Sequence, residues 1–218
     1  MTDCDLVLPC RDEAAALPDL LGRVPDVFGV IVVDNGSSDG TAAVARSLGA
    51  RVVAEPTPGY GAAVHAGVAA STAEYIAVID GDGSLDPADL LPLLEWVASG
   101  RADLAVGRRR PTAEARWPWH ARVGNGVALR WLAWRSGLQL HDIAPARVCR
   151  RDDLERLGVA DHRFGYPVEL LLRAGRAGWT VAEVDVAYHP RAAGTRSKVS
   201  GSVAGSLRAA LDFARVLS

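Results

Sequence analysis

The chain has 218 residues, of which 49% are hydrophobic and 23% charged, and a formal net charge of −2. This length fits one domain with a sizeable core, and the near-neutral charge gives no reason to expect a nucleic-acid partner. No stretch is apolar over the roughly 18 residues of a membrane span, and the first residues do not resemble a signal peptide. We therefore expect one cytoplasmic domain over residues 1–218, with peripheral contact at the inner face of a membrane left open.

The first half of the chain alternates short apolar runs with longer helical patterns. Runs rich in Val and Ile predict strands at 5–9, 29–34, 51–55, 75–80 and 102–107. Apolar residues at helical spacing predict helices at 13–24, 39–48, 61–71 and 87–99. Asp39 and Asp86 fit helix N-caps, and Pro87 fits the first helical position after Asp86. This alternation predicts an α/β fold with a mostly parallel central sheet and helices on both faces.

The second half has a different pattern. Residues 117–136 hold four of the six tryptophans and predict a helix with a broad apolar face. A further helix is predicted at 169–178, and the alternating residues 180–190 predict a half-buried strand. A polar loop at 191–202, rich in Gly, Ser, Arg and Lys, precedes a predicted helix at 203–217.

The three cysteines, Cys4, Cys10 and Cys149, are an odd and widely spaced set without a CxxC pair. Such a set favours reduced thiols over a disulfide framework or a zinc site. We therefore expect three free thiols.

Two carboxylates end the predicted strand at 75–80, in the stretch YIAVIDGDGS. Ligands bind beyond the carboxyl ends of the strands in sheets of this kind. Asp80 and Asp82 stand two residues apart there, and glycines at 81 and 83 let the backbone turn so that both carboxylates reach one hard cation. Mg²⁺ and Mn²⁺ favour such oxygen ligands and share them with phosphate. A solvated turn is the alternative interpretation, but a turn needs no second aspartate.

A second polar strand end lies in VVDNGSSDGT, where Asp34 and Asn35 follow an apolar run. Asp-Asn-Gly-Ser is favourable turn chemistry by itself. The other interpretation is that both side chains face the crevice and hydrogen-bond a base or ribose. The residues alone leave both interpretations open.

Two other motifs compete for these residues. An EF-hand loop that starts at Asp80 needs glycine at its sixth position and glutamate at its twelfth, where this chain has Leu85 and Leu91, so this motif is excluded. The stretch GYGAAV, residues 59–64, has two glycines of a dinucleotide fingerprint and an acidic residue about 20 positions further on. Val64 replaces the third glycine, so this match is weak.

Six stretches, taken in chain order, resemble the family 2 glycosyltransferases of the GT-A fold: VLPCRDE, VVDNGSSDGT, GYGAAVHAG, VIDGDGSLDP, VGRRR and HDIAPARVCRRD. The stretch FGYPVELLLRAGRAGWTVAEVDVAYHPRAAGTRSKVSGS is similar to the dolichol- and polyprenol-phosphate sugar synthase branch, with its aromatic-x-x-E helix, E-V-x-V strand and R…G…SK…G loop. The resemblance spans nearly the whole chain. It implies a GT-A-like fold with a nucleotide-sugar-binding half at 1–110 and an acceptor-side half at 111–218.

The resemblance implies roles for the residues that match the family's motifs. Pro9 and Glu13 match positions that line the nucleotide base and ribose, and Arg11 stands where the family often has an aromatic residue. Asp34 matches the strand-end acid, and Asn35 replaces a second aspartate of many relatives. The implied nucleotide-binding residues are Pro9, Arg11, Glu13, Asp34, Asn35, Gly59, Gly61, Asp80 and Gly81.

Asp80 and Asp82 match the family's metal-binding D-x-D motif, which implies Mg²⁺ or Mn²⁺ as the cofactor. Ser84 stands where several members that act on lipid phosphates have glutamine, and Arg108 matches an arginine near the donor or acceptor phosphates. A divalent cation bound to both aspartates would stabilise the charge that develops on the leaving nucleotide.

A phosphate acceptor is already an anion, so it needs positioning and charge neutralisation rather than a general base. Arginine and lysine suit this task, and the motif spacing leaves open whether Arg191 or Arg196 binds phosphate. Asp142 fits a residue that orients the acceptor or acts as base, and Arg147 fits a phosphate ligand; a buried structural Asp–Arg pair is the alternative. The implied phosphate- and acceptor-binding residues are Arg108, Arg147, Arg191, Arg196, Ser197 and Lys198, and the implied catalytic residues are Asp82, Asp142, Arg108 and Lys198.

We therefore expect a metal-dependent, inverting glycosyltransferase that moves a hexose from a UDP- or GDP-linked sugar to a polyprenyl or dolichyl phosphate. Two alternatives stay open. One is transfer to a soluble hydroxyl acceptor, and the other is a sugar-nucleotide-binding protein without turnover.

Overall fold

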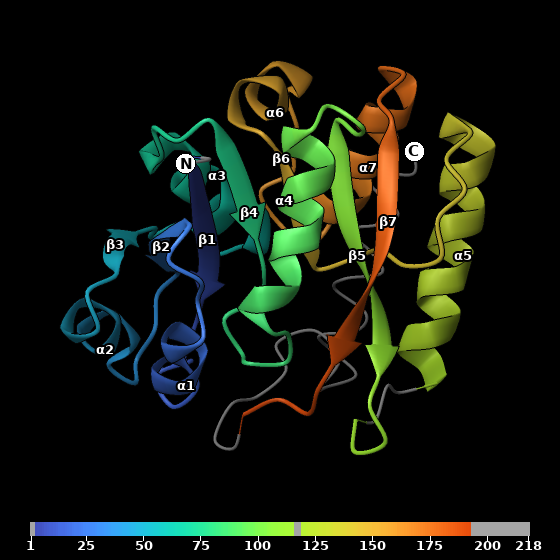
Figure 1. The fold of residues 1–218 in the computed structure, drawn as a ribbon. Helices are drawn as coiled ribbons and strands as arrows, with labels where there is room; N and C mark the ends of the chain where they lie inside the picture. Colours follow the sequence, from blue (N-terminus) through green and yellow to red (C-terminus); the bar gives the residue numbers. More distant parts are fainter. Residues whose placement is uncertain (1–2, 116–118, 193–218) are drawn as a thin grey trace.

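The computed structural model describes residues 3–115 and 119–192, with the backbone alone at 119–121 (Figure 1). The strands are β1 (Cys4–Cys10), β2 (Phe28–Asp34), β3 (Arg51–Ala54), β4 (Tyr75–Val78), β5 (Leu104–Pro111), β6 (Ala146–Arg150) and β7 (Val181–Tyr188). The helices are α1 (Leu17–Gly22), α2 (Thr41–Ser47), α3 (Tyr60–Ala70), α4 (Leu90–Ala98), α5 (Trp119–Ser136), α6 (Arg151–Leu157) and α7 (Tyr166–Arg176), with a 3₁₀ turn, η1 (Pro87–Asp89), before α4. The helix predicted at 203–217 lies outside the described residues.

The strands of the described residues form one sheet in the order β3-β2-β1-β4-β6-β5-β7. Neighbouring strands are parallel except at β6, which runs antiparallel to both β4 and β5. The predicted α/β fold with a mostly parallel sheet is confirmed. Because every strand except β6 points the same way, their carboxyl ends share one edge of the sheet, the lower edge in Figure 1.

Helices cover both faces of the sheet, as predicted. In β1, Leu6 and Leu8 belong to a buried cluster with residues of α1 and α4, whereas Val7 belongs to a cluster with residues of α3 and α7. All three side chains are completely buried. A strand buried on both faces needs apolar residues at every position, which explains the continuous runs of Val, Ile and Leu in the first half of the sequence.

Two elements differ from the prediction. The sequence analysis predicted neither β6 nor α6, because the stretch around them is rich in charged residues and Arg147 lies inside β6. The burial pattern nevertheless shows that four of the five residues of β6 are buried. A single short strand with a buried arginine does not produce the apolar run by which the other strands are recognised.

One predicted helix cap is confirmed and one is wrong. Asp86 caps η1, since its Oδ1 accepts the Ala88 N–H at 2.9 Å and Pro87 occupies the first position. Asp39 is not an N-cap residue: α2 begins at Thr41 after Gly40. The Asp39 carboxylate still contacts the start of the helix, since its Oδ1 accepts the Thr41 N–H at 3.0 Å, and its Oδ2 accepts the Ala14 N–H at 3.0 Å and so joins two loops.

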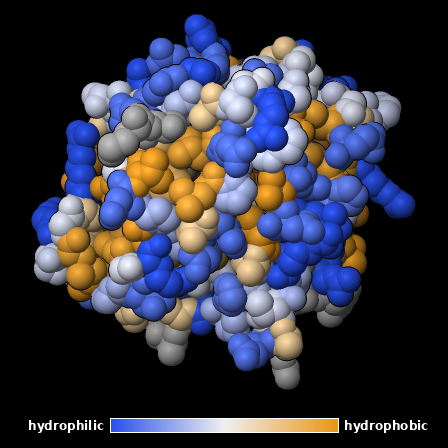
Figure 2. Space-filling model, in the orientation of Figure 1, coloured by the Kyte–Doolittle hydropathy of each residue, from blue (hydrophilic) through white to orange (hydrophobic). Residues whose placement is uncertain are grey.

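The three cysteines are buried and free, in agreement with the prediction. Within the described ranges, no helix combines the length and the apolar character that crossing a bilayer requires. Figure 2 shows one face of the molecule, on which apolar patches are interspersed with hydrophilic side chains.

Candidate functional site

The turn after β4 carries the two predicted metal-binding carboxylates, Asp80 and Asp82. Asp82 is buried, with 3% of its surface exposed, and its Oδ1 accepts the Ser84 N–H at 2.9 Å. Glycine is required at position 81 because a Cβ there would overlap the sulfur of Cys10. The turn therefore packs directly on the end of β1, which holds the two carboxylates at the carboxyl edge of the sheet.

The segment that follows β7 binds the same turn. Nη1 of Arg191 lies 2.9 Å from Oδ2 of Asp82. The Ala192 N–H donates to the backbone carbonyl of Asp82 at 3.1 Å, and the His189 N–H donates to that of Ser84 at 2.9 Å. Of the two arginines that the sequence left as alternatives, Arg191 therefore lies against a predicted metal ligand.

Asp80 is surrounded by charges of both signs. Burial and the neighbouring charge of Asp82 raise the pKa of Asp80 to about 6, while Arg191, Arg147 and Arg109 act in the opposite direction. These three arginines come from separate segments of the chain, so the fold gathers positive charge around the two carboxylates.

The variant Asp80→Asn is expected to be more stable than the wild type by roughly 1–3 kcal/mol near pH 7.5 without added metal. The pKa is about 6 in the folded protein and about 3.9 in the unfolded chain, so the wild type loses stability as pH rises between these values. The neutral amide has no such loss. Denaturant unfolding in the presence of a chelator, at several pH values across this window, measures the difference.

If Asp80→Asn exceeds the wild type in stability by the same amount below about pH 4, the raised pKa of Asp80 is not the cause of the difference. Excess Mg²⁺ serves as the internal control. Excess Mg²⁺ is expected to reduce the difference in unfolding free energy between Asp80→Asn and the wild type. The reason is that a cation that binds only the folded wild type stabilises that protein by mass action.

The predicted nucleotide-binding residues after β1 and β2 lie at the same edge. Pro9 is partly buried, Arg11 is exposed and Glu13 is buried. The Glu13 N–H donates to Thr41 Oγ1 at 2.9 Å, which ties the loop after β1 to the start of α2. Asp34 accepts a backbone N–H of the turn that follows it at 3.1 Å.

Asn35 has a structural task that the sequence did not reveal. Its Nδ2 donates to the carbonyls of Glu55 and Thr57 at 2.9 and 2.7 Å, and its Oδ1 accepts the Gly59 N–H at 2.9 Å. The amide group thus holds the loop between β3 and α3. This geometry favours the structural interpretation of Asn35, and its contact with a base stays a prediction.

The two glycines of GYGAAV lie in close contact with the backbone of residues 161–162. A Cβ at Gly59 would overlap the carbonyl of His162, and one at Gly61 would overlap that of Asp161. The Ala62 N–H donates to the His162 carbonyl at 2.8 Å, so the start of α3 docks on the loop before α7. Close packing therefore accounts for both glycines, and their nucleotide-binding role stays a prediction.

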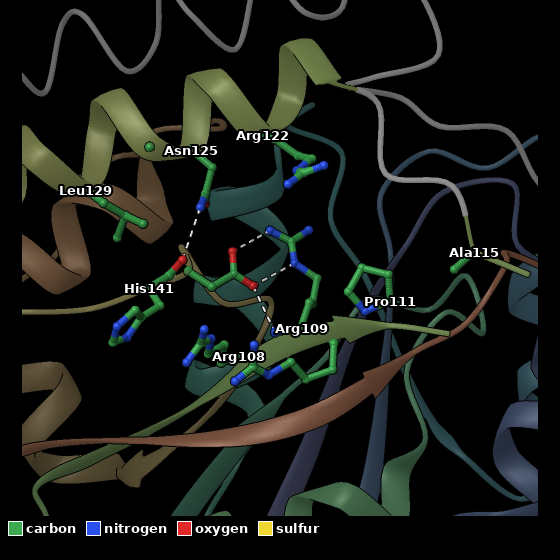
Figure 3. A pocket seen from close by; sticks show the side chains of 11 residues that line it. Arg108, Arg109, Pro111, Ala115, Arg122, Asn125, Leu129 and His141 are labelled. Carbon is green, nitrogen blue, oxygen red and sulfur yellow. Dashed lines mark hydrogen bonds and ion pairs between the residues drawn. The ribbon is translucent and has the colours of Figure 1, made fainter. Parts of the chain in front are cut away.

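Asp142 forms a buried ion pair with Arg109, which the sequence analysis did not identify as a site residue. The Arg109 Nε and Nη2 donate to the two carboxylate oxygens at 2.8 and 2.7 Å, and the Arg109 backbone N–H donates to Oδ2 at 3.1 Å (Figure 3). The side chains are 1% exposed for Asp142 and 19% for Arg109. Both oxygens of Asp142 are thus engaged, which favours the structural interpretation over that of a base.

Glu183 of β7 is a second residue that the sequence analysis missed. Its Oε1 accepts the backbone N–H groups of His141 and Asp142 at 2.8 and 3.1 Å, and its Oε2 lies 2.7 Å from His141 Nδ1. Glu183 therefore positions the loop that carries Asp142, and through it Arg109. The signal was present in the alternation of β7, where Glu183 and Asp185 stand two residues apart on one face.

A pocket of about 630 Å³ opens beside this ion pair, between the end of β5 and α5 (Figure 3). Its polar lining residues are Arg108, Arg109, Arg110, Arg122, Asn125, His141 and Asp142. Four arginines against one carboxylate give the pocket a positive potential, which attracts anions. Arg108 and Arg110 both lie near Asp185 outside the pocket, at 3.8 and 2.8 Å.

Arg147, predicted as a phosphate ligand, is 3% exposed. Its Nη1 donates to the hydroxyl of Tyr60 at 3.1 Å, and its Nε has no hydrogen-bond partner among the residues that the structure describes. Arg147 does not pair with Asp142, so the Asp–Arg pair considered from the sequence forms with a different arginine. A buried arginine with one unmatched donor beside Asp80 suits an anionic ligand.

Three predicted residues, Arg196, Ser197 and Lys198, lie outside the described residues. In the described part of the chain, no group of three or more His, Cys, Asp or Glu side chains is arranged to hold a metal. Asp80 and Asp82 offer two carboxylates. Two are enough for Mg²⁺, which proteins commonly bind through one or two carboxylates while phosphate oxygens and water complete the coordination. The residues present fit that cofactor.

The comparison with protein families matches residues 5–158 to the model of glycosyl transferase family 2. An uncharacterized glycosyltransferase of Mycobacterium tuberculosis is 55% identical over 214 residues, which cover 98% of this chain and 97% of the relative. The polyprenol monophosphomannose synthase of Mycolicibacterium smegmatis is 35% identical, over 90% of this chain and 81% of its own length.

Among solved structures, the chain is similar to glucosyl-3-phosphoglycerate synthase from Mycobacterium tuberculosis in complex with Mn²⁺, UDP-glucose and phosphoglyceric acid. The TM-score is 0.78 with 22% sequence identity, over 99% of this chain and 80% of that one. This likeness supports the GT-A-like architecture of the sheet and its helices.

Proposed function

The chain belongs to the family 2 glycosyltransferases, and we propose that it transfers a hexose from a UDP- or GDP-linked sugar to a polyprenyl phosphate with inversion. The observation that carries this proposal is the gathering of Arg109, Arg147 and Arg191 around Asp80, beside an arginine-lined pocket. Two phosphorylated substrates need such a concentration of cationic groups next to a metal site.

Asp80 and Asp82 would hold Mg²⁺ or Mn²⁺, with the donor diphosphate as the further ligand. The bound cation supplies Lewis acidity at the oxygen of the leaving nucleoside diphosphate. Burial, and then the repulsion from Asp82, raise the pKa of Asp80. A shared cation would relieve that repulsion, which supports this assignment.

The donor nucleotide would lie along the edge formed by the ends of β1 and β2, near Pro9, Glu13 and Asp34. These residues are positioned by contacts between the loops, such as the Glu13–Thr41 hydrogen bond, before any ligand arrives. Prior positioning of this kind reduces the entropy lost on binding.

The acceptor phosphate would bind between Arg108, Arg109 and Arg147. A phosphate monoester is ionised at neutral pH and can attack the anomeric carbon without a base. The geometry of Asp142 agrees with this chemistry. Both of its carboxylate oxygens accept hydrogen bonds from the Arg109 guanidinium, so Asp142 serves as the counter-ion of Arg109 and not as a general base. The 35% identical polyprenol monophosphomannose synthase supports a lipid phosphate as the acceptor.

Transfer to a soluble, anionic hydroxyl acceptor is the second candidate. The pocket of about 630 Å³ is large enough for a small phosphorylated acid. The structural relative solved with phosphoglyceric acid shares the architecture and supports this alternative at the level of the fold.

Incubation with Mn²⁺ and a panel of UDP- and GDP-hexoses separates these candidates. The acceptors are a polyprenyl phosphate, the matching polyprenol without phosphate, and 3-phosphoglycerate. We expect the sugar on the polyprenyl phosphate alone and no product with a chelator. Product on 3-phosphoglycerate alone would reject the lipid acceptor, and product on the unphosphorylated polyprenol would reject the arginine-bound phosphate.

A further inference from the structure

The contact between Arg191 and Asp82 places a positive charge on a carboxylate assigned to a divalent cation. Asp82 Oδ2 lies 2.9 Å from the guanidinium, and its Oδ1 accepts the Ser84 N–H at 2.9 Å. The Asp82 side chain is 3% exposed, so its charge is compensated by these partners rather than by bulk water.

We propose that Arg191 and the divalent cation compete for Asp82, and that Arg191 moves to the donor diphosphate when the cation binds. This inference rests on the proposed metal site at Asp80 and Asp82. A guanidinium and a hard dication both bind carboxylate oxygens, so Arg191 and the cation would share Asp82. Their positive charges repel each other when both lie at one carboxylate. Displacement of the arginine is therefore part of binding the cation.

The backbone keeps Arg191 within reach of either partner. The Ala192 N–H binds the Asp82 carbonyl at 3.1 Å, and the His189 N–H binds the Ser84 carbonyl at 2.9 Å. These two hydrogen bonds flank residue 191 on both sides and do not involve its side chain. Rotation of the Arg191 side chain alone therefore suffices for the exchange, and the end of β7 stays docked on the turn.

The exchange links the affinities for metal and nucleotide. With the cation alone, the displaced guanidinium has lost its counter-ion and stands near a dication. A diphosphate supplies negative charge to both, so metal and nucleoside diphosphate are expected to strengthen each other's binding. Arg191 is thus a donor-binding residue whose exchange between Asp82 and the diphosphate couples the binding of metal and donor.

Mn²⁺ binding, measured by electron paramagnetic resonance or calorimetry at neutral pH, tests this competition without any turnover. In the absence of nucleotide, Arg191→Gln is expected to bind Mn²⁺ about tenfold more tightly than the wild type. Saturating UDP or GDP is expected to tighten Mn²⁺ binding by the wild type more than by Arg191→Gln. The variant Arg191→Lys keeps the charge and is expected to resemble the wild type.

Arg101→Gln is the matched control, because Arg101 pairs with the exposed Glu95 of α4 and belongs neither to the turn nor to the pocket. It is expected to bind Mn²⁺ as the wild type does. Unchanged or weaker Mn²⁺ binding by a folded Arg191→Gln overturns the competition. If Asp82→Asn binds Mn²⁺ as tightly as the wild type, the metal site of the proposed function is wrong, and the competition is overturned with it.

Discussion

Asp82→Asn is expected to abolish metal-dependent donor binding and to lower kcat/KM for glycosyl transfer by about 10³-fold or more. Asparagine has nearly the same shape and can still accept the Ser84 N–H that Asp82 Oδ1 binds at 2.9 Å. What disappears is the negative charge that a divalent cation needs at this position. The fold should persist, because the backbone contacts of the turn are unchanged.

Calorimetric titration with donor, with and without Mn²⁺, measures the loss of metal dependence separately from turnover. Asp86→Asn makes the same chemical change four positions further on, where the side chain caps η1 and pairs with Arg23. This control is expected to keep the wild-type kcat/KM within about twofold. Retained metal-dependent binding in Asp82→Asn would move the cation to other ligands.

Arg109→Met is expected to lower the free energy of unfolding by about 3–5 kcal/mol. The substitution leaves Asp142, 1% exposed, without its counter-ion and without two of its three hydrogen bonds from Arg109. Removing both charges in Arg109→Met/Asp142→Leu should recover most of this loss, because no unpaired charge then remains in the interior.

Equilibrium unfolding in urea measures these differences through the transition midpoint at constant slope. The neighbouring Arg110→Met is the control. Arg110 is 51% exposed and its partner Asp185 is 53% exposed, so this variant should cost no more than about 1 kcal/mol. A normal stability of Arg109→Met, together with a pH–rate profile that loses one limb in Asp142→Asn, would instead identify Asp142 as a base.

Much of the sheet edge could be predicted because it depends on local sequence. The apolar run before Asp80 is a strand with both faces buried, and a strand of a mostly parallel sheet must deliver its last residues to the common edge. The same reasoning places Asp34 at that edge. At position 81 the sequence indicates only a residue that permits a turn or a close approach; the neighbour that makes a Cβ unfavourable there, the sulfur of Cys10, comes from another strand.

Partners across the fold could not be predicted in this way. Arg109 and Asp142 are 33 residues apart, and their pairing depends on β6 lying between β4 and β5. The burial of Arg147 follows from the same insertion. Local patterns carry no information on which of several arginines reaches which acid, because that choice is made by tertiary packing.

Asn35 illustrates a different limit. Its residue type fits both a turn and a ligand contact, and the choice is made by the loop at 55–59, which takes up the amide's hydrogen bonds. A side chain whose chemistry suits two tasks is assigned only when its neighbours are known. The sequence therefore locates the candidate site more reliably than it apportions tasks within it.

Cys10 lies directly beneath Gly81, so the two carboxylates rest on a sulfur atom. Burial and the nearby acidic groups raise the pKa of the Cys10 thiol well above its usual value. Only the thiolate is a good nucleophile, so this sulfur reacts slowly with oxidants and alkylating reagents. The residue on which the carboxylate turn packs is thus a slowly reacting thiol. We therefore expect oxidants in solution to leave the geometry of this turn unchanged.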